Sequence, residues 1–196
     1  MQSLTSAALF SAVVLAGNQP RACQEPDVIQ NFEVASYLGR WYEIYRDADD
    51  TFEYGICNTA NYSLRDDGDI RVRNNEFYPD TQTWGGGEGK AFQVYPSADD
   101  GYLKVKFGPL IPAGDYKILY TDYTSVTVIY TCLGLGDFAS REYVWILSRT
   151  PQVPEASWDA AVNAVHEQVP LYEFEENAYY CPQTPNYPCP YNSEPI

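Results

Sequence analysis

Two glutamates, Glu43 and Glu76, are the side chains in this chain best suited to acid and base chemistry. Each lies in a segment with the composition of a β-strand, and alternation along the strand places both carboxyl groups on the inner face of a sheet. Burial raises the pKa of a carboxyl group, so such a pair can act as general acid and general base. The pair supports one hypothesis, an enzyme acting on a lipophilic substrate.

Other kinds of chemistry have less support. His166 is the single histidine, so neither a His-based zinc site nor a Ser-His-Asp triad has a strong case. The glycine-rich run 84–90 lacks the spacing of a phosphate-binding loop, and its glycines favour hairpin freedom and cavity room. The acidic runs 47–53 and 66–69 lack the spacing of an EF-hand and are typical of solvated turns. We therefore predict no catalytic and no metal site, and keep the glutamate pair as the alternative.

Charge and hydropathy exclude two classes of partner. Twelve Lys and Arg against 27 Asp and Glu give a formal net charge of -15, which repels the phosphates of nucleic acids. No later apolar run reaches the roughly 20 residues of a transmembrane helix. We expect neither nucleic-acid binding nor stable membrane insertion.

The N-terminal residues have the character of a signal peptide. Residues 1–20 carry no charged side chain, and the run 7–17 is apolar except for Ser11. Such a run is too short to cross a bilayer and is typical of a signal sequence. We expect 1–22 to be a signal peptide and the protein to be secreted and extracellular.

The cysteine pattern fits that compartment. The five cysteines are far apart and form no CxxC motif, which indicates disulfides with one thiol left over. Spacing alone leaves the pairing open.

Short β-branched and aromatic segments, separated by turn signals, predict eight strands. The turns include Asp67-Gly68 and Asp100-Gly101, dipeptides typical of hairpins. The expected strands cover residues 39–45, 57–64, 70–77, 88–95, 102–107, 115–121, 126–133 and 142–149. Even spacing and short turns favour an all-β fold, an eight-stranded antiparallel up-and-down β-barrel whose closure removes the exposed strand edges.

One α-helix is expected after the strands, packed on the outside of the barrel. Pro151 and Pro154 mark its start, and apolar residues then recur at three- and four-residue steps up to Val169. The Pro- and Tyr-rich segment 182–196 is expected to be an extended tail, held only where a cysteine fixes it. The chain thus divides into a signal peptide, a barrel domain over 23–181 and this tail.

Three ordered motifs resemble the signature of the lipocalin family. They are Gly39-Arg40-Trp41 in the first expected strand, Thr121-Asp122-Tyr123 after the sixth, and Arg149 at the end of the eighth. The segments GRWYEI, CNTANYSL, YTDY and YVWILSRTP resemble the branch that includes apolipoprotein D, insect bilin-binding protein and crustacyanin. The resemblance runs from about Cys23 to Cys181 and implies a lipocalin barrel.

The resemblance gives the motif residues structural roles. Trp41 would close one end of the barrel, with the guanidinium of Arg149 lying over the indole as a cation–π pair. Gly39, Thr121 and Asp122 would likewise make the fold rather than bind the ligand.

The resemblance also implies the disulfides Cys23–Cys132 and Cys57–Cys181, which would tie the leader and the tail to the barrel. Cys189 would then be free or intermolecular. A third hypothesis follows, a secreted structural protein joined into homo-oligomers through Cys189.

Asn61 begins the N-glycosylation sequon Asn61-Tyr62-Ser63, which lies where the resembling sequences also carry ANYSL. An attached glycan requires Asn61 to face outward. Alternation then turns Asn58 and Tyr62 inward.

Further inward positions follow from charge and from the resemblance. Arg71, Arg73, Lys104 and Lys106 belong in water, so their neighbours on the strands face in. Cys132 must face outward to reach the leader, which turns Thr131 inward on the seventh expected strand. The resemblance adds inward positions on the sixth and eighth expected strands. The predicted ligand-binding residues are Asn58, Tyr62, Asn74, Glu76, Phe107, Tyr116, Ile118, Tyr120, Thr131, Tyr143 and Trp145.

The lining is aromatic and aliphatic with a few polar groups, which fits a flat conjugated or steroid-like molecule. The resemblance favours a biliverdin-like bilin or a carotenoid, and a steroid, fatty acid or retinoid stays open. The inner face holds no Lys or Arg for bilin propionates, and Arg46 and Lys117 are expected at the open end, with Phe52 and Leu110 at loop tips. The leading hypothesis is an extracellular, non-enzymatic carrier or pigment-binding protein, with Trp145 as its main contact.

Overall fold

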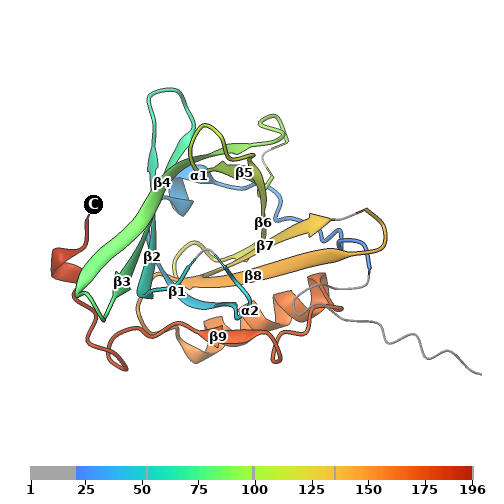
Figure 1. Cartoon of the computed structure of the whole chain (residues 1–196). Coiled ribbons are helices and arrows are strands. Elements are labelled where there is room, and N and C mark those ends of the chain that lie inside the picture. Colours follow the sequence, from blue (N-terminus) through green and yellow to red (C-terminus); the bar gives the residue numbers. More distant parts are fainter. Residues whose placement is uncertain (1–20, 52, 99, 135, 196) are drawn as a thin grey trace, which may run out of the picture.

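The computed structural model describes residues 21–51, 53–98, 100–134 and 136–195. Eight antiparallel strands form a closed barrel (Figure 1), which confirms the predicted fold class. Most of the expected signal peptide, residues 1–20, lies outside the described residues. Phe52, which was expected at a loop tip, also lies outside them. The strands are β1 (Gly39–Asp47), β2 (Ile56–Leu64), β3 (Ile70–Tyr78), β4 (Thr83–Gln93), β5 (Tyr102–Lys106), β6 (Gly114–Thr121), β7 (Val126–Gly134) and β8 (Ser140–Ser148).

Strands that follow one another in sequence are neighbours in the barrel, and β1 closes it. The first part of β1, Gly39 to Tyr42, pairs with β2, and the part from Tyr42 to Arg46 pairs with β8. A ninth strand, β9 (Ala178–Tyr180), pairs with the end of β1 beyond its pairing with β2. The sequence did not indicate β9, because its residues gain their strand conformation only from the open edge of β1.

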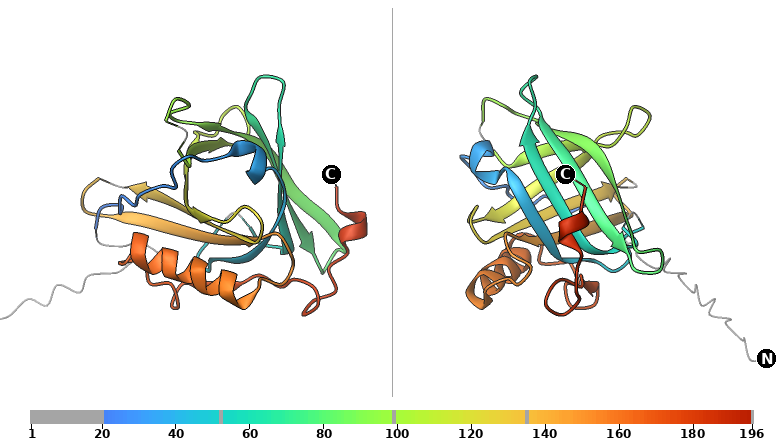
Figure 2. Two further views of the ribbon diagram at one scale, coloured as in Figure 1. Left: turned by 180° about the vertical axis from the view of Figure 1, so that it is seen from behind. Right: turned by 90° about the vertical axis from the view of Figure 1, so that its left-hand side faces the viewer.

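The helix α2 (Glu155–Gln168) lies on the outside of the barrel, as predicted (Figure 2). Its apolar face, which includes Ala161 and Val165, packs on β6 and β7. A single helix turn, α1 (Val34–Tyr37), precedes β1 and was not expected. No helix among the described residues is long and apolar enough to cross a membrane.

Strand β4 begins five residues earlier than the sequence indicated, at Thr83 rather than Glu88. The glycines of this run are not a loop but pair with β3 along its length. Gly86 has a positive φ of 129°, and a Cβ there would collide with the carbonyl group of Asn74. Glycine is therefore required where the two backbones approach closely.

Alternation along the strands separates two apolar clusters. The inner cluster, inside the barrel, includes Trp41, Ile129 and Leu147. The outer cluster lies between the barrel and α2 and includes Val128 and Ile146. Cys132 belongs with the outer cluster, so the predicted orientation of β7 is correct.

The closed end of the barrel is built by the motif residues. Trp41 is fully buried, its Nε1 donates to the carbonyl of Tyr37 at 2.9 Å, and the guanidinium of Arg149 lies 3.7 Å from the ring centroid. Asp122 Oδ1 accepts hydrogen bonds from the backbone N–H groups of residues 124, 125 and 126, which fixes the turn between β6 and β7. The Thr121 hydroxyl donates to the carbonyl of Val126 in the same turn.

One of the two predicted disulfides is present and the other is wrong. Cys23 and Cys132 are bonded, which ties the leader to β7. Cys57 is bonded to Cys189 instead of Cys181, whose thiol is free and buried. The predicted intermolecular role of Cys189 is therefore also wrong, because its sulfur is used within the chain.

The C-terminal tail is docked on the barrel rather than extended (Figure 2). Its short 3₁₀ turn, η1 (Tyr191–Ser193), leads to Glu194, whose buried carboxylate meets Arg40 at 2.8 Å. The same carboxylate accepts hydrogen bonds from Asn75 and Thr59. The sequence missed this docking because the partners lie more than a hundred residues before the tail.

The leader is held by one buried carboxylate, that of Glu142 on β8. Arg21 forms a two-pronged ion pair with it, and Tyr130 and Gln24 also donate to it. Burial opposes its charged form, but these bonds outweigh burial and lower the pKa of Glu142.

Glu142→Gln is expected to lower the free energy of unfolding by about 1–3 kcal/mol at neutral pH, because the charged donor Arg21 loses its carboxylate partner. A lowered folded pKa stabilises the fold above the unfolded pKa, and this stability is lost as the pH falls through the folded value. Urea unfolding of both proteins should therefore show a difference that shrinks below about pH 4. A difference that stays constant from pH 7 to pH 3 would contradict the assignment.

Candidate functional site

The inner wall of the barrel holds most of the predicted ligand-binding residues. Tyr62 and Ile118 belong to the inner cluster, and Phe107, Tyr116 and Trp145 pack against it. Tyr143 stacks on Trp145 with ring centroids 5.8 Å apart. The predicted alternation of β8 is therefore confirmed.

Several inward-facing aromatic side chains are only half-buried, among them Phe107, Tyr116 and Trp145. A side chain that points into a barrel and still contacts solvent borders space that a small molecule can enter. Phe107 lies against Gly87 and Gly89 of β4, where larger side chains would meet its ring. The glycines thus make room for the ring of Phe107, so the space predicted along this wall is filled by that side chain.

Three tyrosine hydroxyls meet near the closed end. Tyr116 lies 2.8 Å from the hydroxyl of Tyr62 and 3.0 Å from that of Tyr37. Burial raises the pKa of Tyr37 to about 12 and that of the other two well above the usual value, so all three stay neutral. Sequence reasoning missed Tyr37, which α1 delivers from outside the strands.

The predicted inward position of Tyr120 is wrong. A β-bulge between Ile118 and Tyr120 shifts the register with β7. Tyr120 then pairs with Val128 and packs against the outer cluster. Thr131 is half-buried and pairs with Tyr143, so its predicted orientation holds.

A second bulge, between Glu43 and Tyr45, turns Arg46 inward beside Glu43. The two side chains are buried and form an ion pair of 2.7 Å. The thiol of Cys181 donates to the same carboxylate oxygen. The prediction that the inner face holds no cation is therefore wrong, although this cation is already paired.

The loop between β1 and β2 brings a further carboxyl group to the wall. Arg46 Nη2 donates to the backbone carbonyl of Glu53 at 2.8 Å, and Trp145 Nε1 donates to the Glu53 carboxyl at 3.1 Å. Burial raises the pKa of Glu53 well above its ordinary value, and the nearby charges of Glu43 and Asp50 raise it further. The same loop contact therefore joins the main predicted ligand residue to an acidic group that sequence reasoning missed.

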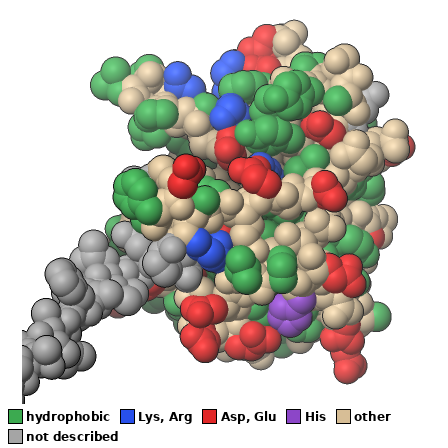
Figure 3. All heavy atoms as spheres, turned by 90° about the vertical axis from the view of Figure 1, so that its right-hand side faces the viewer, with side chains coloured by type: hydrophobic (Ala, Val, Ile, Leu, Met, Phe, Trp, Pro, Cys, Tyr) green, Lys and Arg blue, Asp and Glu red, His purple; other side chains and the backbone are tan. Residues whose placement is uncertain are grey.

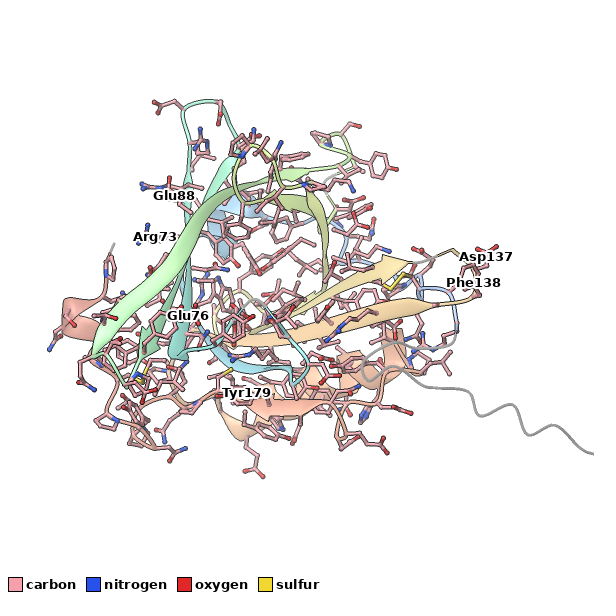
Figure 4. The ribbon with its side chains drawn as sticks, in the orientation of Figure 1. Arg73, Glu76, Glu88, Asp137, Phe138 and Tyr179 are labelled. Carbon is pink, nitrogen blue, oxygen red and sulfur yellow. A yellow bond between two sulfur atoms is a disulfide. The ribbon has the colours of Figure 1, made fainter. Side chains whose placement is uncertain are left out.

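Glu43 and Glu76 are not brought together as an acid and base pair. Glu76 accepts hydrogen bonds from the backbone N–H of Tyr54 and Gly55 and from the hydroxyl of Tyr78. Glu43 is held by Arg46 in a separate network. Glu76 on β3 is labelled in Figure 4. Its role in the structure is to anchor the loop between β1 and β2.

Two polar groups of this wall lack partners. Asn58 alternates with Ala60 and Tyr62 on β2, is 2% exposed and has an Oδ1 without a hydrogen bond. Asn74 Oδ1 on β3 is also buried without a partner. Unpaired buried acceptors are costly, so they indicate where a ligand donor would bind.

Asn61 faces outward, as its sequon requires. Its Nδ2 donates to the Glu194 carboxylate at 3.3 Å, so the docked tail covers this side chain. Glycosylation of Asn61 stays a prediction.

The described residues contain no group of three or more His, Cys, Asp or Glu arranged to hold a metal ion. His166 lies exposed on α2, 3.5 Å from Glu175 (Figure 3). On the face shown there, acidic side chains are scattered at the surface.

Comparison with known proteins agrees with the barrel. The family model described as a lipocalin-like domain matches residues 32–175. Apolipoprotein D of Rattus norvegicus is 45% identical over 132 residues, covering 67% of this chain and 68% of its own.

Solved structures share the fold. Lobster apocrustacyanin A1 has a TM-score of 0.75 at 17% identity, covering 92% of this chain and 98% of its own. Insecticyanin from Manduca sexta has a TM-score of 0.74 at 18% identity, covering 86% and 89%. At these identities the likeness concerns the fold alone.

Proposed function

Since the chain belongs to the lipocalin family, we propose that it is an extracellular carrier that holds one small hydrophobic ligand inside the barrel. The observation that carries the proposal is the inner aromatic wall, which remains partly open to solvent within a closed barrel. An eight-stranded barrel is about wide enough for one small ligand. The two disulfides support an oxidising compartment.

The ligand classes are those that a flat aromatic wall accepts. A bilin or carotenoid chromophore, a steroid, a retinoid and a fatty acid all offer an apolar body for Trp145 and Tyr143 to contact. The test is an absorption spectrum of protein purified from its natural source, with mass spectrometry of an organic extract. A protein with no extractable organic molecule that also fails to bind apolar probes would contradict the proposal.

Trp145→Ala is expected to weaken binding of all-trans-retinol, used as a fluorescent apolar probe, by about tenfold or more, because a central aromatic contact is lost. Fluorescence titration measures the change. Phe138→Ala, at the tip of the loop between β7 and β8 (Figure 4), is the matched control and should bind as the wild type does. Equal affinity of the Trp145 variant and the wild type would refute the assignment.

A further inference from the structure

The wall near Trp145 carries more carboxyl groups than the cation beside them can neutralise. Glu43 and Glu53 both approach Arg46, whose two terminal nitrogens are bonded to the Glu43 carboxylate and to the Glu53 carbonyl oxygen. The Arg46 guanidinium also lies 4.3 Å from the ring centroid of Tyr179. Arg46 is therefore engaged by several groups, and the Glu53 carboxyl, which also interacts with the carboxyl groups of Glu43 and Asp50, shares this cation with Glu43.

A second cation, Arg141, lies beside the loop between β1 and β2 and does not change this balance. Its guanidinium is 5.2 Å from the ring centroid of Tyr143 and donates to the carbonyl of Asp49. The charges of Asp47, Asp49 and Asp50 act on the same ring. Carboxylates thus outnumber cations around the ring of Tyr143 as well.

The hydrogen-bond donors among the uncharged polar groups of the wall are already in use, whereas one acceptor has no partner. The indole N–H of Trp145 is used by Glu53, and the Tyr62 and Tyr116 hydroxyls bond to each other. Asn58, by contrast, presents a buried oxygen without a partner. Gln183 Nε2 donates to the backbone carbonyls of both Glu43 and Asn58. The backbones of Glu43 and Asn58 therefore lie on either side of Gln183, just beyond the last paired residues of β1 and β2.

Building on the proposed carrier function, we infer that the barrel binds a protonated amine attached to a flat apolar body. The ammonium group donates to the Glu53 carboxylate and to the free oxygen of Asn58, and the body lies on the stacked rings of Tyr143 and Trp145. An ammonium ion supplies both missing features, a positive charge and several donors.

The same balance disfavours acidic ligands. A ligand carboxylate would meet Glu43 and Glu53 at close range in a medium that screens charge poorly. Burial, followed by the neighbouring carboxyl groups, raises the pKa of Glu53 despite the opposing charge of Arg46. The proton that this carboxyl group then holds is the one that an ammonium group replaces.

The test uses three probes with one naphthalene body: 2-(1-naphthyl)ethylamine, 2-(1-naphthyl)ethanol and 1-naphthylacetate. Titration calorimetry at neutral pH is expected to give the amine a Kd at least about tenfold lower than the alcohol, as a charged hydrogen bond provides, with the acetate weakest. Glu53→Gln is expected to remove the advantage of the amine and leave the Kd of the alcohol within about twofold.

Glu88→Gln is the matched control, because it removes one negative charge from an exposed pair with Arg71 on the outer face (Figure 4). It should keep the preference for the amine. Glu53→Ala provides a second variant at the same position, and circular dichroism checks the fold of each.

The inference is overturned if folded wild-type protein binds amine and alcohol equally, or if the amine keeps its advantage in both Glu53 variants. Binding of the alcohol in those cases leaves the carrier function standing. If no probe binds and retinol does not bind either, the carrier function itself fails.

Discussion

Trp41→Ala is expected to lower the free energy of unfolding by about 3–5 kcal/mol, since a fully buried indole is removed from the closed end of the barrel. The loss extends beyond the cavity. Arg149 lies over the indole ring and donates to the carbonyls of Arg40, Ser36 and Tyr37. Loss of the indole therefore also weakens the packing of Arg149, which bonds the segments that close the barrel. Urea unfolding followed by circular dichroism measures the change.

Phe138→Ala is the control for this prediction, because Phe138 is 76% exposed and its removal leaves no cavity. It should change the free energy of unfolding by no more than about 0.5 kcal/mol. A Trp41 variant as stable as this control would show that the closed end does not depend on the indole.

Cys189→Ser is expected to lower the free energy of unfolding by about 2–5 kcal/mol, because the bridge to Cys57 closes a loop of 132 residues. The tail should also leave the barrel, since Glu194 would have to stay docked without its covalent tie. Peptide mapping of the non-reduced wild type should find Cys57 linked to Cys189.

Cys181→Ser is the matched control, because it removes a cysteine that forms no bridge. It should leave both linked peptides in place and cost less stability than Cys189→Ser. A map of the wild type that links Cys57 to Cys181 would contradict the structure. On non-reducing gels the wild type should run as a single chain, because Cys189 is already bonded within it.

The strands, the turn between β6 and β7 and the closed end could be predicted from the sequence, because hydrophobic alternation and the ordered motifs are local signals. Inward positions held where a strand is regular, as at Tyr143 and Trp145 on β8. The inward position predicted for Tyr120 is wrong, and Arg46 turns inward although no cation was expected there. Each residue follows a bulge that reverses the alternation and has no clear mark in the sequence.

The remaining errors involve contacts between distant parts of the chain. Cys181 and Cys189 lie near the same end of the barrel, so spacing could not decide which one reaches Cys57. Tyr37 and Glu53 come from a short helix and a loop, where no periodicity assigns a direction. The sequence predicted the aromatic wall of the site. It did not predict that Arg46 and Glu53 lie beside Trp145.

The docked tail also makes the order of synthesis important for Asn61. The atom that would carry a glycan, Asn61 Nδ2, bonds to Glu194, which follows it by 133 residues. A sugar attached while the chain is still being made would occupy that face before residue 194 exists. The tail of a glycosylated molecule therefore has to dock beside the sugar, with the one N–H that Asn61 Nδ2 retains left to donate to Glu194.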